Sequence, residues 1–223
     1  MRWPRFSRPH ARDRARMVAE QLEARGIDDS EVLRAFRTVE RHRFVEGDEP
    51  YGDHALPVGS GQTISQPYIV AVMTLAARPP EGWADANILE VGTGSGYQAA
   101  LLAELGARLT TIERHDELAT TARRRLADAS YAQRIEVVVG DGTQGWPAHA
   151  PYRSILVTAG GPSVPAPLLE QLDPSGGRLV MPVGDRERQT LTLVVRDADA
   201  LTSTELDPVV FVPLIGEHGH RAG

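Results

Sequence analysis

The sequence predicts an α/β protein with a doubly wound, mostly parallel seven-stranded sheet and an N-terminal cap of helices. From Asn87 onward, apolar runs of strand length alternate with helical patterns, which is typical of βαβ units whose helices cover both faces of a parallel sheet. The gaps between the last three strands are short, so an antiparallel edge is expected. With 223 residues, 41% of them hydrophobic, the chain can bury a sizeable core.

Residues 1–80 are expected to form helices and an ordered loop in front of a core at 81–223, the two parts making one compact unit. Apolar side chains recur at helical spacing over 11–25 and 30–38, and Gly26 ends the first helix. Residues 47–67 are rich in glycine, proline and polar side chains but also carry large apolar ones. This composition favours an ordered functional loop over a linker.

The remaining elements follow from the positions at which each apolar pattern begins and ends. The strands are predicted at 87–91, 108–113, 135–139, 153–158, 177–183, 189–195 and 209–213. The helices are predicted at 67–78, 96–105, 116–129 and 165–172.

The first of these strands ends in a glycine-rich turn, Glu90-Val91-Gly92-Thr93-Gly94-Ser95-Gly96. Glycine lacks a Cβ and admits positive φ, so the backbone can turn sharply and approach a ligand closely. The spacing fits neither the P-loop nor the Gly-x-Gly-x-x-Gly dinucleotide fingerprint. It resembles the Glu/Asp-x-Gly-x-Gly-x-Gly pattern of S-adenosylmethionine-dependent methyltransferases, and we expect residues 92–96 to bind that cofactor. The alternative is a flexible strand–helix turn without a ligand.

Acidic residues follow two more strands, at the edge where open α/β sheets bind ligands. Glu113 comes about 20 residues after the first glycine and is predicted to bind the two ribose hydroxyls. Asp141 and Gly142 follow the third strand, and Asp141 or the neighbouring backbone is predicted to face the adenine. Glu90 is expected to contact the methionine end of the cofactor, directly or through water. Simpler roles remain open: a solvated helix-start residue for Glu113 and a cap of neighbouring amides for Glu90.

Composition narrows the chemistry. The formal charge of −6 argues against a general nucleic-acid surface. The absence of cysteine and lysine excludes thiolate catalysis, cysteine-ligated metals and Schiff-base chemistry.

No apolar run reaches membrane-spanning length or forms a signal peptide, so a cytoplasmic protein without membrane contact is expected. His218 and His220 lie in an expected frayed tail without a carboxylate cluster, and no metal site is predicted. A solvated terminus is the simplest interpretation of the basic arm formed by Arg2, Arg5, Arg8, Arg12, Arg14 and Arg16.

Two motifs ahead of the glycine turn are more selective than the turn itself. They are Tyr51-Gly-Asp53-His-Ala-Leu56-Pro57 and Gly61-Gln62-Thr63-Ile64-Ser65-Gln66-Pro67. Further matches include Arg41-His-Arg-Phe44-Val45, Ala150-Pro151-Tyr152, Gly176-Gly177-Arg-Leu-Val180-Met-Pro182 and Phe211-Val212-Pro213-Leu214. From about residue 12 to residue 215 the chain thus resembles the protein-L-isoaspartate (D-aspartate) O-methyltransferase family.

The resemblance implies S-adenosylmethionine as cofactor and puts Ser65 beside the transferred methyl group and the incoming carboxylate. There its hydroxyl can orient the acceptor by a hydrogen bond. Thr63, Ile64 and Gln66 are expected to bind substrate in the same loop. The acceptor is already ionised at neutral pH, so no general base is needed. A helix N-cap before Gln66-Pro67 is the alternative role for Ser65, and Asp53 is expected mainly to stabilise the loop.

The implied activity is esterification of isoaspartyl residues in damaged proteins and peptides, which initiates repair through a succinimide. Two departures from the family pattern bear on the substrate. Arg153 stands where the family usually has an acid, and Gly160-Gly161 stands where it usually has alanine, both at positions that border the cleft in the family. A dedicated peptide aspartate O-methyltransferase that modifies one precursor, and a catalytically silent binding module, therefore stay open. A monomer is expected.

Overall fold

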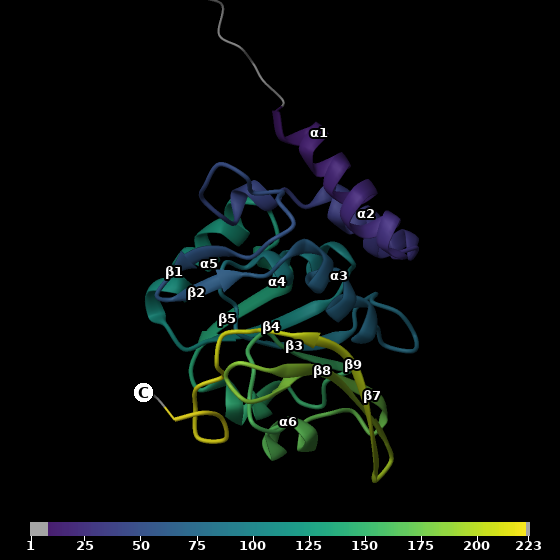
Figure 1. Ribbon diagram of the computed structural model, residues 1–223. Coiled ribbons are helices and arrows are strands. Elements are labelled where there is room, and N and C mark those ends of the chain that lie inside the picture. Colours follow the sequence, from purple (N-terminus) through teal and green to yellow (C-terminus); the bar gives the residue numbers. More distant parts are fainter. Residues whose placement is uncertain (1–8, 222–223) are drawn as a thin grey trace, which may run out of the picture.

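The computed structural model describes residues 9–221, which form a seven-stranded sheet with helices on both faces (Figure 1). The strands are β3 (Asn87–Val91), β4 (Arg108–Glu113), β5 (Ile135–Val139), β6 (Ser154–Val157), β7 (Ser175–Gly184), β8 (Gln189–Asp197) and β9 (Ala200–Val209). They stand in the order β5-β4-β3-β6-β7-β8-β9. The first five are parallel to their neighbours, and β7, β8 and β9 form an antiparallel meander. The predicted fold class is confirmed.

The helices agree with the predicted ones in order and approximate length. They are α1 (Pro9–Arg16), α2 (Ser30–Thr38), α3 (Pro67–Ala76), α4 (Tyr97–Glu104), α5 (Asp116–Asp128) and α6 (Ala166–Glu170). In Figure 1, α3, α4 and α5 lie on one side of the sheet with α1 and α2 beyond them, and α6 lies on the other side. Short 3-10 turns lie at Arg41–Arg43, Ala132–Arg134, Gly142–Gln144 and Pro147–His149.

Local sequence explains where the N-terminal helices begin and end. α1 continues as a π-helix over Met17–Leu22 and a 3-10 turn over Glu23–Arg25, and Gly26 stops it with a φ of 89°. Asp29 caps α2 by accepting hydrogen bonds from the backbone N–H groups of Glu31 and Val32. The predicted stop at Gly26 and the predicted helix 30–38 are therefore confirmed.

Two details differ from the prediction. The expected last strand at 209–213 is wrong, because the last strand, β9, ends where that segment was to begin. β9 is exposed along almost its whole length, so it lacks the apolar alternation that identifies a half-buried strand. The functional loop contains a hairpin of β1 (Leu56–Gly59) and β2 (Gln62–Ile64), which turns at Ser60-Gly61 with positive φ at both residues.

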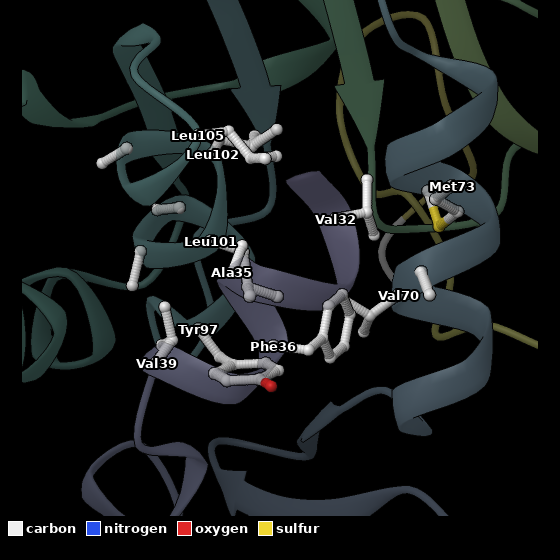
Figure 2. Close-up of a cluster of buried hydrophobic side chains, with 14 of the residues drawn as sticks. Val32, Ala35, Phe36, Val39, Val70, Met73, Tyr97, Leu101, Leu102 and Leu105 are labelled. Carbon is white, nitrogen blue, oxygen red and sulfur yellow. The ribbon is translucent and has the colours of Figure 1, made fainter. Parts of the chain in front are cut away.

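The sheet separates two apolar clusters, because successive side chains of a strand point to opposite faces. Ile88 belongs to the cluster under α2, α3 and α4, whereas Leu89 and Val91 belong to the one under α6. Figure 2 shows the first cluster, in which Phe36 of α2 lies between Tyr97 of α4 and the apolar side of α3. Truncating a buried phenylalanine to alanine costs about 3–5 kcal/mol, so this packing fixes the helical cap on the core.

No helix within residues 9–221 is both long and apolar enough to cross a membrane. A frayed, solvated terminus is wrong for the part of the basic arm that carries Arg12, Arg14 and Arg16, because these residues lie on α1 and Arg14 pairs with Glu40. Arg2, Arg5 and Arg8 lie outside the described residues. The division of the chain at residue 80 stays a prediction.

Candidate active site

The glycine turn lies at the carboxyl end of β3, where the order of strands reverses. The chain passes from β3 to β4 and β5 on one side and then returns to β6 on the other. Such a reversal is where open α/β sheets bind ligands. A cavity at this edge, here called the central cavity, brings together most of the predicted residues. Its lining includes Thr63, Ile64, Ser65, Glu90, Gly92, Thr93, Gly94, Ser95, Glu113 and Gly142. Gly96, Gln66 and Asp141 lie next to it.

The structure gives different reasons for glycine at different positions of the turn. All have positive φ, 96° at Gly92, 52° at Gly94 and 87° at Gly96, where α4 begins. A Cβ on Gly92 would lie 2.4 Å from the Thr158 hydroxyl oxygen, which donates a hydrogen bond to the Gly92 carbonyl. A Cβ on Gly94 would meet nothing within 4 Å. Gly92 is thus required by packing, whereas Gly94 leaves its backbone open to a ligand.

Glu113 is buried and held by the backbone, so the solvated helix-start role is wrong. Its Oε2 accepts a hydrogen bond from Gly94 N at 2.9 Å, and its Oε1 accepts one from His115 N at 3.0 Å. A carboxylate offers about four lone-pair sites, so both oxygens keep acceptor capacity. The side chain therefore fixes the turn and can still accept hydrogen bonds from a diol.

Glu90 is completely buried and only half satisfied. Thr111 donates a hydrogen bond to Glu90 Oε2 at 2.5 Å, and the Thr93 hydroxyl lies 2.7 Å from that of Thr111. Oε1 has no hydrogen-bond partner within the described chain. Burial, together with the charge of Glu113, raises the pKa of Glu90 to about 8, although the hydrogen bond from Thr111 acts to lower that pKa. A buried acceptor left free at the wall of a cavity fits a polar or cationic ligand group.

Ser65 faces the central cavity, and the N-cap alternative for it is wrong. The N-cap of α3 is Gln66, with Pro67 at the first helical position, and no side chain caps this helix. The Ser65 carbonyl accepts a hydrogen bond from the Arg41 guanidinium at 2.8 Å. Asp53 binds Arg25 through its carboxylate and Gln66 through its carbonyl, as expected of a loop-stabilising residue.

A second cavity, here called the outer groove, adjoins the central cavity at Thr63 and Ser65, which line both. Gln66 and Ile69 form one wall of the outer groove, and Val209, Val210 and Phe211 form another. Charged side chains stand at its rim: Asp53, Glu187 and Arg188. The catalytic candidate Ser65 therefore lies at the junction of the two cavities.

The sequence did not reveal how the C-terminal segment closes the central cavity. Val212, Pro213, Leu214 and Ile215 line it, although only a resemblance drew attention to the first three. The expectation of a frayed tail is wrong, because His220 N donates to Leu214 O at 2.8 Å and His218 N donates to Thr143 Oγ1 at 3.2 Å. This segment is paired to the core rather than loose.

Asp141 fastens this C-terminal segment. Its Oδ1 accepts hydrogen bonds from Thr143 N and Oγ1, and its Oδ2 accepts one from Glu217 N at 2.7 Å. These hydrogen bonds outweigh the cost of burial and lower the pKa of Asp141. Of the predicted adenine contacts, Gly142 lines the central cavity, and its missing Cβ makes room for Val91.

The two departures from the family pattern have separate explanations. Arg153 does not border the cavity: it lies at the amino end of β6, the opposite edge of the sheet, and pairs with Glu81 and Asp173. Gly160 and Gly161 do lie near the cavity. A Cβ on Gly160 would lie 2.5 Å from the Gln189 amide carbon, and one on Gly161 would lie 2.6 Å from the Met181 methyl group. Larger neighbours thus occupy the space that an alanine methyl group would fill.

Comparison with known proteins decides the family. A family model described as Protein-L-isoaspartate(D-aspartate) O-methyltransferase (PCMT) matches residues 13–219. The chain belongs to this family. Membership confirms the predicted enzyme class, an S-adenosylmethionine-dependent protein carboxyl O-methyltransferase.

Relatives of this O-methyltransferase support the same assignment. The protein-L-isoaspartate O-methyltransferase of Methanoculleus marisnigri is 52% identical over 216 residues, covering 95% of each chain. A protein of the same name, numbered 1, from Syntrophobacter fumaroxidans is 52% identical over 209 residues, covering 92% of this chain and 95% of its own.

Solved structures agree on the fold. One protein-L-isoaspartate O-methyltransferase has a TM-score of 0.81 at 24% identity, covering 92% of this chain and 67% of its own. A second, from Plasmodium falciparum and described as putative and in complex with S-adenosyl-L-homocysteine, has a TM-score of 0.78 at 21% identity, covering 92% and 98%. At these identities the likeness shows the fold of the methyltransferase and nothing more specific.

Proposed function

We propose that this O-methyltransferase esterifies the free α-carboxylate of isoaspartyl residues in damaged proteins and peptides. The backbone amide nitrogen of the next residue can then attack the ester carbonyl and expel methanol, and hydrolysis of the resulting succinimide can give aspartate. The observation that carries the proposal is the junction at Ser65, where the central cavity meets the outer groove. A cofactor bound in the central cavity and a peptide bound in the outer groove would meet at this residue.

The residues of the central cavity fit S-adenosylmethionine. The open Cβ position of Gly94 leaves room for a ligand against the backbone, and Glu113 retains acceptor capacity for the ribose. The unpartnered Oε1 of Glu90 suits the polar methionine end. Gly92, Thr93, Ser95 and Gly96 shape the turn, and we assign Gly142 and the Asp141 backbone to the adenine side.

The chain's part in the chemistry is orientation and exclusion of water. When bound, the cofactor supplies an electrophilic methyl group on a sulfonium. The acceptor carboxylate is ionised at neutral pH, so the chain would need no general base and would only have to hold one carboxylate oxygen in line with the methyl group. The Ser65 hydroxyl can donate one hydrogen bond that aligns the other carboxylate oxygen. Apolar groups around it, Ile64, Val70 and Met73, keep water away.

Acceptor choice rests on geometry, because isoaspartyl and aspartyl carboxylates are both ionised. The isoaspartyl main chain runs through the side-chain carbonyl, so the free α-carboxylate is attached directly to Cα. The carboxylate of an aspartyl residue is one methylene group further from the main chain. A groove that grips extended backbone through Thr63, Gln66 and the 208–211 segment would bring only this carboxylate within about 3–3.5 Å of the methyl carbon. Backbone recognition also allows many sequences to bind.

A pair of peptides tests the proposal against a dedicated peptide aspartate O-methyltransferase. Several unrelated peptides are made with isoaspartate or aspartate at the same position and incubated with purified protein and labelled cofactor. We expect base-labile methyl esters on every isoaspartyl form and little on the aspartyl forms. Equal labelling of aspartyl forms, or labelling of one sequence alone, would refute the repair assignment. No labelling despite cofactor binding would favour a silent binding module.

We also propose that the enzyme acts as a monomer in the cytoplasm, on protein substrates rather than nucleic acid. The net charge of −6 and the absence of cysteine support these assignments. Size-exclusion chromatography with light scattering would test the monomer, since a dimer would double the measured mass.

A further inference from the structure

Arg41 is a buried cation between the helical cap and the active-site loop. Its side chain is fully enclosed, in the 3-10 turn Arg41–Arg43 that follows α2. Nε donates a hydrogen bond to the Pro50 carbonyl and Nη2 donates one to the Ser65 carbonyl, both at 2.8 Å. No carboxylate within residues 9–221 forms an ion pair with it. The hydrogen bonds of the guanidinium thus go to two backbone carbonyls and not to a carboxylate.

These two carbonyls stand at the ends of the active-site loop. Pro50 precedes the Tyr51–Pro57 motif and Ser65 directly follows β2 within the Gly61–Pro67 motif, with the β1–β2 hairpin between them. One planar guanidinium therefore holds both ends of the loop in a fixed relation, which a flexible point charge would do less well. Because Nη2 binds the backbone of Ser65, it restrains the residue whose hydroxyl faces the acceptor.

The same guanidinium also contacts the cofactor side of the site. Its carbon lies 4.9 Å from the centroid of the Tyr97 ring, a cation–π arrangement. Tyr97 is the first residue of α4, directly after the glycine turn, and it lines the central cavity. Figure 2 shows the Tyr97 ring beside Phe36 of α2, and the Phe44 ring centroid lies 5.8 Å from that of Tyr97. Arg41 thereby touches both the acceptor loop and the start of the cofactor-binding helix.

Fold stability alone does not account for this arrangement. Desolvating a guanidinium costs several kcal/mol, and apolar residues of similar volume often replace buried charges without loss of stability. Here the charge has no acidic partner and its Nη1 has no hydrogen-bond partner. The desolvation cost of Arg41 therefore falls at a position that connects the acceptor loop at Ser65 with the cofactor-binding helix at Tyr97.

We propose that Arg41 is a positioning residue for methyl transfer, which sets the Ser65 backbone relative to the glycine turn and so aligns the acceptor carboxylate with the methyl group. The proposal rests on the proposed function, because it gives Ser65 an acceptor to orient. Arg41 itself lines neither cavity and does not touch the reacting atoms.

The test separates catalysis from cofactor binding. Turnover on a saturating isoaspartyl peptide, the peptide KM and the calorimetric Kd of S-adenosylhomocysteine are measured for Arg41→Met, Arg41→Lys and the wild type. We expect Arg41→Met to lower kcat at least about tenfold while the Kd changes less than about threefold. Arg41→Lys should fall between, because an ammonium keeps the charge but not the planar fork. Arg37→Met is the matched control, since Arg37 lies on α2 and pairs with Glu23 at the surface.

A double-mutant cycle with Ser65→Ala asks whether Arg41 acts through Ser65. If it does, the Arg41 substitution should lower kcat less than about threefold in the Ser65→Ala background. If Arg41→Met fails to fold, Arg41→Lys carries both measurements, with an expected loss in kcat of at least about threefold alone and less than about 1.5-fold in the Ser65→Ala background. Folded Arg41 variants that keep kcat within about twofold of wild type, or losses that multiply in the double variant, would refute the positioning role. Wild-type protein inactive on every isoaspartyl peptide would instead refute the proposed function, and this proposal with it.

Discussion

Replacing Glu90 by glutamine should remove a large pH dependence from the stability of the cofactor-free protein. Burial raises the pKa of Glu90 to about 8, whereas a glutamate in the unfolded chain titrates near 4.3. Between these values the folded state holds a proton that the unfolded state has released. The free energy of unfolding therefore falls by about 1.4 kcal/mol per pH unit as the pH rises. Over two units, from about pH 5.5 to about pH 7.5, the loss is about 2.7 kcal/mol.

Urea denaturation of both proteins at several pH values measures this difference. The free energy of unfolding of wild type relative to Glu90→Gln should decline steadily with pH and level off above about pH 8, where Glu90 is ionised in both states. A pH-independent difference in the free energy of unfolding between the two proteins does not affect the test, because only the dependence of that difference on pH reports the titration of Glu90. Glu205→Gln is the matched control, since it makes the same chemical change on the exposed strand β9.

A flat difference between wild type and Glu90→Gln across this range would refute the argument. It would mean that Glu90 is ionised in the folded protein at neutral pH, with water or a cation at its Oε1. The same experiment with saturating S-adenosylhomocysteine is informative, because a ligand ammonium at Glu90 would favour the carboxylate and reduce the slope.

Three further substitutions probe the rest of the site. Glu113→Ala should weaken S-adenosylhomocysteine binding by about 1.5–3 kcal/mol in calorimetry, because a buried acceptor is lost, and unchanged affinity would remove Glu113 from the site. Asp141→Ala should speed proteolysis and hydrogen exchange of residues 214–220, since the hydrogen bond to Glu217 N is lost, and unchanged exchange would contradict its fastening role. Gly160→Ala should lower the free energy of unfolding by about 1–3 kcal/mol, because its Cβ would overlap Gln189; a neutral effect in urea denaturation would show that Gln189 moves aside.

The sequence predicted most of the fold because its core strands are buried on both faces. β3 and β6 contain short apolar runs, and β4 is rich in β-branched residues. β3 leads into the glycine turn and β4 ends at Glu113, so these limits are visible locally. The sequence does not predict β9 correctly because it is a solvated edge strand, held by its ladder to β8 rather than by buried side chains. The apolar segment after it has the composition of a strand, although its apolar side chains line the central cavity.

The cofactor side of the site was predictable for the same reason. Its residues follow the ends of parallel strands, and those ends meet at one edge of the sheet. The acceptor side and the C-terminal closure depend on contacts between residues far apart in the chain, such as Gly160 with Leu214 and Asp141 with Glu217. No local periodicity encodes such contacts, so only resemblance to a family drew attention to Phe211-Val212-Pro213-Leu214.

Glu90 and Arg41 are ionisable side chains at fully buried positions. Glu90 shares a face of β3 with Ile88, and the enclosed guanidinium of Arg41 lies over the ring of Tyr97. Each is a buried ionisable group without an ion-pair partner in the described chain, an arrangement that costs stability. Sequences are expected to break the rules of core composition where function requires it. Apolar or neutral replacements that stabilise the cofactor-free fold while lowering cofactor binding at Glu90, or turnover at Arg41, would show that this cost serves the reaction.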